Sequence, residues 1–337
     1  MTFEDGVCAL MRKILEMSAE FLVADIGGTN VRFAIAHIEN NNDIKIENLS
    51  VLPTENWLYL EDAVFDYLKH VGSSPMRAAI AFAGPVNKDE VSMTNGTWQF
   101  NQSELAPFMK MDEVKVFNDF CAKACSLIML RDDQIRQIGG TGEIEERGNK
   151  IVVGPGTGIG VGALVSAGDK WKALASEAGH VGFSPRGDLE KEIANVLSED
   201  YQRISVEDLV SGRGLSNIYY ALGLVKDKRY LKIHPSEIFD KAENENDEDS
   251  IETFKLFSGM LGCFASDMAG AFNATGGVYL SGGVLPKLGK YFVEEDFRTN
   301  FEANERLPFV QDIKTHMILE EQPALYGAAG YYSGMFL

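Results

Sequence analysis

Two glycine-rich turns, each between two apolar runs, constrain the fold of this chain more than any other feature. The first lies in residues 21–36, FLVADIGGTNVRFAIA, and the second in residues 150–164, KIVVGPGTGIGVGAL. Each pattern predicts two strands joined by a tight turn. Because each hairpin begins a separate half of the 337-residue chain, we expect two related domains that grip one phosphorylated ligand between them.

The first turn carries residues suited to an anion. Gly27 and Gly28 let backbone N–H groups approach a phosphate without a Cβ in the way, and the hydroxyl of Thr29 adds a donor. Asp25, at the end of a buried strand, is costly there unless it holds water, a cation or a donor. An ordinary hairpin with an acidic cap is the alternative interpretation.

Two familiar nucleotide motifs are excluded. Neither turn has the form G-x-x-x-x-G-K-[ST], and the glycines between 154 and 162 lead into a second apolar run. A phosphate-binding loop or a dinucleotide fingerprint would lead into a helix instead. The pattern therefore argues against a P-loop NTPase and against a dehydrogenase.

Composition limits the partners. A formal charge of −19 and 45% hydrophobic residues indicate a globular protein that does not bind nucleic acid or anionic lipid. An anionic ligand such as a nucleotide is still possible, because local N–H groups, Mg²⁺ and a few basic side chains decide its binding. The longest apolar runs fall short of the roughly 18 residues that a membrane span needs.

The four cysteines and the first twenty residues bear on location and assembly. The cysteines form no C-x-x-C pair, so we expect buried thiols in a reducing, cytoplasmic compartment rather than a metal or redox pair.

Residues 1–20 lack a signal-peptide pattern and repeat apolar residues at helical spacing. We expect an amphipathic helix that docks on this chain or on a second subunit, unless Met17 is the biological start.

The order of elements predicts an α/β fold. Up to residue 130 the pattern reads β-β-β-α-β-β-α, with strands apolar enough to be covered on both faces. The polar segment 139–149 lies near a boundary, and a long apolar helix is expected over 251–273. The acidic segment 241–250, KAENENDEDS, is predicted to be a solvated loop.

Asp119 is the strongest candidate for a catalytic residue. It follows a buried strand and begins a helix, which places it at the carboxyl edge of the sheet, where ligands bind in open α/β sheets. A carboxylate there can accept the proton of a sugar hydroxyl that attacks phosphorus. Asn118 and Asp119 are also residues that cap helices, so a structural role is the alternative.

A second group of polar residues lies further along the chain. Glu177 and His180 stand three residues apart between small residues, and Glu207 follows. Such side chains suit a polyol, whose hydroxyls both donate and accept hydrogen bonds. A metal pair lacks a third ligand at familiar spacing, and a structural role for His180 is the other alternative.

Eight segments in order resemble the bacterial-type glucokinase family, ATP-dependent hexose kinases of the actin/Hsp70/sugar-kinase fold. They are LVADIGGTNVRFAIA, AIAFAGPV, MTNGTWQF, VFNDF, GPGTGIGVG, SEAGHVGFSP, VEDLVSGRGL and GGVYLSGGV, and the resemblance runs from about residue 19 to the C-terminus. It implies an actin-like ATPase (ribonuclease H-like) fold with an interdomain cleft. The implied domains are an N-terminal extension (1–20), a small domain (21–128 with 324–337) and a large domain (129–323).

The resemblance implies transfer of the γ-phosphoryl group of ATP to the 6-hydroxyl of glucose, the first step of glycolysis, in a homodimer. Asp119 matches the catalytic base, and Asp25 would lie near Mg²⁺. The matching sugar ligands are Asn95, Asn118, Asp119, Glu177, His180 and Glu207. The matching nucleotide residues are Asp25, Gly27, Gly28, Thr29, Asn30, Gly156, Thr157, Gly158, Gly282 and Gly283.

The chain departs from the family pattern at some positions. SEAGHVGF has Ser and Ala where relatives often carry Gly, and Gly182 where an acid is common, which affects pocket shape and sugar preference. A related repressor/kinase branch carries a cysteine-rich zinc motif after its histidine, and nothing after His180 resembles it, so we expect no structural zinc. A kinase for mannose, N-acetylglucosamine or another hexose, and a non-catalytic sugar sensor, are the alternative functions.

Overall fold

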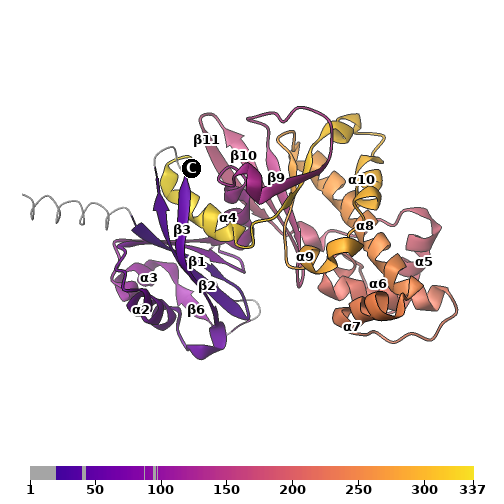
Figure 1. Cartoon of the computed structure of the whole chain (residues 1–337), viewed down its shortest axis with the longest axis horizontal. Helices are drawn as coiled ribbons and strands as arrows, with labels where there is room; N and C mark the ends of the chain where they lie inside the picture. Colours follow the sequence, from indigo (N-terminus) through magenta and orange to yellow (C-terminus); the bar gives the residue numbers. More distant parts are fainter. Residues whose placement is uncertain (1–19, 40–42, 87, 94–95, 97) are drawn as a thin grey trace, which may run out of the picture. The chain divides into compact units, whose positions relative to one another are not determined.

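The computed structural model describes residues 20–39, 43–86, 88–93, 96 and 98–337 (Figure 1). The chain divides into two compact units. Unit 1 comprises Met1–Gln134, Leu164–Ala175 and Glu320–Leu337, and unit 2 comprises Ile135–Ala163 and Ser176–Leu319. The amphipathic helix expected over 1–20 falls, except for its last residue, outside the described residues.

Unit 1 is built on a five-stranded mixed sheet in the order β3-β2-β1-β4-β7. The first three strands are antiparallel neighbours, whereas β4 runs parallel to β1 and β7 parallel to β4. The strands are β1 (Glu20–Ile26), β2 (Asn30–Ile38), β3 (Ile44–Pro53), β4 (Arg77–Phe82) and β7 (Glu113–Asn118), with a separate ribbon of β5 (Glu90–Ser92) and β6 (Gln99–Asn101).

Alternation along β1 builds a core on each face of this sheet. Leu22, Ala24 and Ile26 belong to the cluster that α2 (Leu60–Val71) and α3 (Gln102–Met109) complete, whereas Phe21 and Val23 pack with residues of α11 (Pro323–Gly330). Successive side chains of a strand point to opposite faces, so an apolar strand such as this needs helices on both sides.

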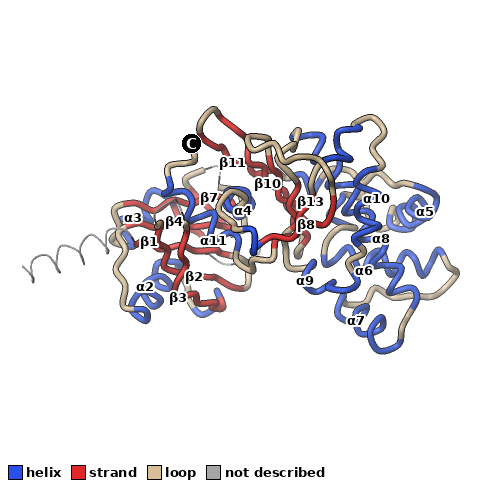
Figure 2. The backbone as a smooth tube through the Cα atoms, turned by 45° about the horizontal axis from the view of Figure 1, so that its top comes forward, coloured by secondary structure: helices blue, strands red, loops and turns tan. Residues whose placement is uncertain are grey.

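The helix α4 (Asp119–Ser126) follows β7 directly and lies beside α11 (Figure 2). The two helices approach closely because Gly327 has no Cβ: a methyl group there would overlap the carbonyl oxygen of Ala122. The contact fixes the axis of α4, and with it the place of the first residue of the helix, Asp119.

Unit 2 contains most of a six-stranded mixed sheet in the order β11-β10-β9-β12-β13-β8. The strand β12 is parallel to both neighbours, and β8 is antiparallel to β13. The strands are β8 (Ile135–Gly139), β9 (Lys150–Pro155), β10 (Ile159–Ala167), β11 (Lys170–Ser176), β12 (Val278–Leu280) and β13 (Thr315–Ile318).

The helices of unit 2 are arranged around the 25-residue α8 (Glu248–Phe272), of which 16 residues are buried. This helix packs tightly against α10, where Gly262 of α8 leaves room for the backbone of Phe297. The other helices are α5 (Gly187–Leu197), α6 (Gly212–Val225), α7 (Pro235–Asp240), α9 (Leu285–Leu288) and α10 (Glu294–Glu302). In the part of the chain that the structure describes, every helix is too short or too polar to cross a membrane.

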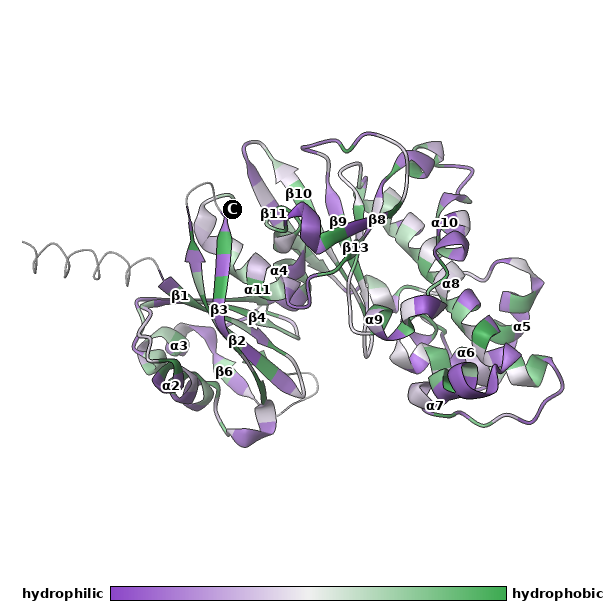
Figure 3. Cartoon of the chain, viewed as in Figure 1, coloured by the Kyte–Doolittle hydropathy of each residue, from purple (hydrophilic) through white to green (hydrophobic). Residues whose placement is uncertain are grey.

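The prediction of a solvated loop over 241–250 was wrong in its secondary structure and for its last two residues, whereas residues 243–246 are exposed as expected. The segment continues α7 as a turn of π-helix (Lys241–Glu245) and then begins α8, and Figure 3 shows the neighbourhood of α7 as largely hydrophilic. Asp249 is only 2% exposed and bonds to Lys226, Lys228 and Tyr230. The carboxylate of Asp249 can therefore be buried because Lys226 at the end of α6 and Lys228 in the following loop pair with it. The acidic composition of the segment gives no sign of these partners.

Candidate functional site

The first glycine turn, residues 27–29 between β1 and β2, is held from both sides. The amide of Gly27 donates to the carbonyl of Asn30 (3.0 Å), and Thr54 bonds to the carbonyls of Gly28 and Thr29, both at 3.0 Å. Neither glycine has a positive φ. Because the turn itself uses the amide of Gly27, the donors that it has to offer to an anion are the amide of Gly28 and the amide and hydroxyl of Thr29.

Asp25 stands opposite Arg32 in the register of the β1–β2 hairpin, and Nη1 of Arg32 lies 3.5 Å from Oδ2 of Asp25. The carboxylate side chain is 18% exposed. Burial raises the pKa of Asp25 above its ordinary value, and the charges of Lys123 and Arg32 oppose that rise. The acidic residue that the sequence singled out thus has two cations near it.

Asn118, not Asp119, caps α4. Its Oδ1 accepts from the amides of Phe120 (2.9 Å) and Cys121 (3.3 Å), and its Nδ2 donates to the carbonyl of Gly84 (3.1 Å). The carboxylate of Asp119 is therefore free of capping, and its Oδ2 accepts from Nζ of Lys123 at 3.1 Å. The capping role considered for this pair belongs to the asparagine, whose side chain keeps one unused N–H.

The strand register brings these residues to one edge of the sheet. Ile26 pairs with Phe82, and Phe82 pairs with Asn118, so the ends of the three parallel strands are level. Asp25 precedes the first of these positions and Asp119 follows the last. The two carboxylates are close enough that the charge of Asp119 contributes to the raised pKa of Asp25.

The second turn, residues 156–158 in unit 2, lies against Glu207. The amide of Gly156 donates to the carbonyl of Gly158 (2.6 Å), and Oε2 of Glu207 accepts from the amide of Ile159 (3.2 Å). A Cβ on Gly158 would overlap the same carboxylate oxygen. A side chain at position 158 is therefore incompatible with this place of Glu207.

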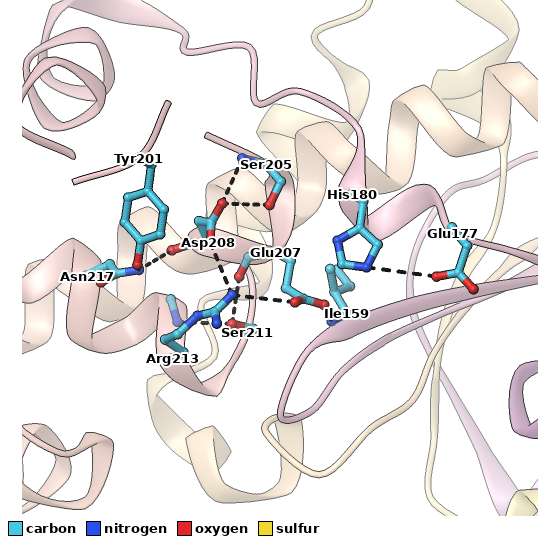
Figure 4. Close-up of polar contacts among 11 residues, drawn as sticks. Ile159, Glu177, His180, Tyr201, Ser205, Glu207, Asp208, Ser211, Arg213 and Asn217 are labelled. Atoms are coloured by element: carbon cyan, nitrogen blue, oxygen red, sulfur yellow. Dashed lines mark hydrogen bonds and ion pairs between the residues drawn. The ribbon is translucent and has the colours of Figure 1, made fainter. Parts of the chain in front are cut away.

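A dense polar network fixes Glu207 in the 3-10 helix η5 (Val206–Asp208), as Figure 4 shows. Asp208 accepts from the amide (2.9 Å) and hydroxyl (2.7 Å) of Ser205, and Ser211 donates to the carbonyl of Glu207 (2.7 Å). Nη2 of Arg213 lies 3.1 Å from Asp208 and 3.5 Å from Glu207. Glu207 is thus a rigidly mounted acceptor whose side chain is still 21% exposed.

Glu177 directly precedes the 3-10 helix η4 (Ala178–His180), and His180 is its last residue, beside this network (Figure 4). Their side chains are 81% and 62% exposed, with Oε2 and Nε2 3.9 Å apart. The helix can lie against the turn end of the β9–β10 hairpin because Gly179 has no Cβ, which would overlap the carbonyl oxygen of Ile159. The structure therefore brings Glu177, His180 and Glu207 around the turn of this hairpin, and the exposed side chains of Glu177 and His180 are open to a ligand.

The third glycine turn adjoins the second. Gly282 has φ +108° and sits where a Cβ would overlap the carbonyl of Pro155, and the amide of Val284 donates to the same carbonyl at 3.1 Å. A Cβ on Gly283 would meet nothing within 4 Å. Gly156, Thr157 and Gly283 line a cavity of about 1350 Å³, whose other walls come from α6, α7, α9 and the segment around Tyr291.

Comparison with known proteins decides the family. The model of the family described as Glucokinase matches residues 22–335. The chain belongs to the glucokinase family. The predicted family, enzyme class and two-domain α/β fold of the actin-like kind are thereby confirmed, and the structure adds that both large sheets are mixed. A glucokinase is an ATP-dependent sugar kinase.

Relatives and solved structures agree with this membership. The glucokinase of Hahella chejuensis is 35% identical over 310 residues, which cover 91% of this chain and 95% of the relative. A crystal structure of glucokinase from an Antarctic psychrotroph is 30% identical, with a TM-score of 0.86 over 93% of this chain and 98% of its own. A ROK family glucokinase from Streptomyces griseus, in complex with glucose and AMPPNP, shares the fold at 19% identity (TM-score 0.62, 93% and 98% covered).

Two basic residues beside the candidate site residues, Lys123 next to Asp119 and Arg213 next to Glu207, were not predicted from the sequence. Lys123 stands four residues after Asp119, a spacing that pairs side chains on a helix, and this spacing could have revealed it. Arg213 is bonded to both acids of η5, but a lone arginine in VEDLVSGRGL gives no such signal. The predicted sugar ligand Asn95 lies outside the described residues.

Proposed function

We propose that this member of the glucokinase family transfers the γ-phosphoryl group of ATP to the 6-hydroxyl of glucose, with Asp119 as the general base. The observation that carries the proposal is the carboxylate of Asp119 at the carboxyl edge of the sheet, uncommitted to helix capping and close to Asp25. A base at this place can reach a hydroxyl bound over the strand ends.

In this mechanism Asp119 accepts the proton of the 6-hydroxyl as its oxygen forms a bond to the γ-phosphorus. The bond from that phosphorus to the bridging oxygen breaks, and ADP leaves with the electron pair. Because the transition state of phosphoryl transfer is loose, positioning and charge neutralisation supply most of the acceleration. The main task of the protein in this mechanism is therefore to orient glucose and ATP, and activation of the sugar hydroxyl contributes less.

We assign the nucleotide to the glycine turns. The cavity lined by Gly156, Thr157 and Gly283 has room for the adenosine part, and Gly158 and Gly282 keep the turns beside it compact. The turn of residues 27–30 offers donors to the terminal phosphates.

Asp25 suits an Mg²⁺ ion that arrives with ATP. Its buried carboxylate is electrostatically costly, and Mg²⁺ is commonly held by one or two carboxylates, water and substrate phosphates. Among the described residues there is no group of three or more His, Cys, Asp or Glu side chains placed to hold a metal by themselves. When bound, the ion would neutralise charge on the β- and γ-phosphates.

We assign glucose to Asn118, Asp119, Glu177, His180 and Glu207, with Asn95 as a further ligand. Acceptors dominate this set, in keeping with a ligand that presents hydroxyl donors. Assays over a panel of glucose, mannose and N-acetylglucosamine test the specificity. Turnover fastest on a sugar other than glucose would reassign the substrate, and tight binding without turnover of any sugar would favour a sensor.

The variant Asp119→Asn tests the general base. It keeps the shape of the side chain but removes its basicity, so we expect kcat to fall by roughly 10³- to 10⁴-fold, near the upper end for a lost general base, while glucose still binds. A coupled assay of ADP release gives kcat, and titration calorimetry gives the Kd of glucose. Near-normal turnover of this variant would remove Asp119 from the role.

We also propose a cytoplasmic homodimer. The three described cysteines, Cys121, Cys125 and Cys263, are free thiols, in keeping with a reducing compartment. Light scattering of the purified chain measures its mass, and a value near the 37.1 kDa of one chain would refute the dimer.

A further inference from the structure

Lys123 lies one helical turn after Asp119 on α4, with Nζ 3.1 Å from Oδ2 of the aspartate. Exposed lysine–carboxylate pairs of this spacing contribute little to stability. This pair differs because the two side chains are only 18% and 17% exposed. The ammonium group of Lys123, which water normally hydrates strongly, is therefore largely buried beside Asp119, the proposed general base.

The ammonium group is restrained on a second side. Its nitrogen lies 4.1 Å from the ring centre of Phe120, within range of a cation–π interaction. Of the described residues, Asp119 is the one hydrogen-bond acceptor of this lysine. The start of α4 is already secured by the cap of Asn118 and by the contact with Gly327, so the fold does not depend on the lysine for either.

Lys123 also faces Asp25. Of the two cations that oppose the raised pKa of Asp25, Lys123 has the larger effect, ahead of Arg32 at 3.5 Å. Two carboxylates and two cations thus gather at this edge of the sheet. Removal of Lys123 would leave a net negative charge beside Asp25 and Asp119, where the γ-phosphoryl group has to arrive. Repulsion between these like charges would raise the activation barrier of phosphoryl transfer.

We propose that Lys123 is a positioning residue for Asp119. Its ammonium holds one carboxylate oxygen, which directs the other oxygen towards the sugar hydroxyl, and it balances the charge of the two carboxylates. This inference rests on the proposed role of Asp119 as the base.

The test compares Lys123→Met, Lys123→Arg and Lys191→Met, with glucose and MgATP as substrates. Methionine keeps an unbranched chain without charge, so we expect kcat to fall roughly tenfold to a hundredfold while the Kd of glucose stays within twofold. Lys123→Arg should restore kcat to within about fivefold, because arginine also donates to the carboxylate. The exposed pair of Lys191 with Asp188, 58% and 95% exposed, serves as the matched control and should change nothing.

A double-variant cycle separates positioning from a structural effect. If the lysine acts through Asp119, adding Lys123→Met to Asp119→Asn should cost no further activity. Unchanged kcat in Lys123→Met, or full additivity in the double variant, would overturn the inference. If Asp119→Asn itself turns over normally, the proposed function fails; if it is inactive while Lys123→Met is fully active, only the inference about the lysine fails.

Discussion

A single methyl group on Gly158 should weaken glucose binding without touching the sugar. The Cβ of Gly158→Ala would overlap Oε2 of Glu207 and lie 2.9 Å from its Cδ, so the carboxylate has to rotate away. The carboxylate of Glu207 then loses the hydrogen bond from the amide of Ile159 (3.2 Å) and its position beside the turn of the β9–β10 hairpin. The backbone conformation of residue 158 accepts alanine, since its φ is not positive.

The size of the effect follows from the bonds that are lost. A hydrogen bond to a charged group is worth about 1.5–3 kcal/mol, and Glu207 would lose one such bond to the amide and one to a sugar hydroxyl. Loss of the bond to the amide of Ile159 only releases the side chain of Glu207. The loss of its bond to the sugar hydroxyl therefore sets the change in glucose affinity. A loss of about 1.5–3 kcal/mol corresponds to a Kd for glucose roughly 10- to 150-fold higher.

Titration calorimetry of glucose on Gly158→Ala and on the control Lys191→Met measures this effect. Lys191 forms an exposed pair with Asp188 outside the proposed site, so this control should bind glucose normally. Combining Gly158→Ala with Glu207→Ala should weaken binding no more than Glu207→Ala alone. A folded Gly158→Ala protein with glucose affinity within twofold of the unchanged chain would show that Gly158 does not keep Glu207 in place for the sugar.

Three further predictions concern stability, each measured by urea unfolding. Burial lowers the pKa of His316 from 6.5 to about 4, so its stabilising contribution is complete above pH 6.5 and is lost as the pH falls towards 4; the unchanged chain should lose about 3 kcal/mol more over this range than His316→Phe. Asp249→Ala should lower the free energy of unfolding by about 1.5–3 kcal/mol, because it removes the charged hydrogen bonds of a buried carboxylate, while the partly exposed Lys226 and Lys228 stay solvated. Asp188→Ala, at an exposed position, should change this free energy very little, and equal effects of the two variants would contradict the expectation. Gly327→Ala should cost about 1–3 kcal/mol by pushing α11 away from Ala122, and an unchanged midpoint would show that the helices can separate freely.

Much of the fold could be predicted because hydrophobic runs and turns are local signals. Both hairpins, β3, α2, β4, β7 and the long α8 follow directly from periodicity and breakers. The sequence did not reveal α3, which contains Pro107, or the nine-residue α10. The three acids in the first turn of α10 favour a helix start, but no side chain caps this short helix, so its local signal is weak. Both helices are stabilised by the packing of a few buried residues, such as Leu105 and Phe297.

The candidate site was less accessible from sequence, because its geometry depends on register and on long-range partners. Nothing in the sequence places Asp25 and Asp119 at level strand ends, since this depends on the pairing of β1, β4 and β7. The burial of Asp249 likewise depends on lysines more than twenty residues away. Glycine spacing indicated the turns, but not that Gly158 makes room for Glu207.

A crystal structure of this chain with glucose and a non-hydrolysable ATP analogue would test the role of Asp119 as the general base most directly. The distance that matters joins the nearest carboxylate oxygen of Asp119 to the 6-hydroxyl oxygen of the sugar. We expect about 2.6–3.2 Å, the range for a general base. A different side chain on that hydroxyl, with Asp119 turned away from it, would contradict the account.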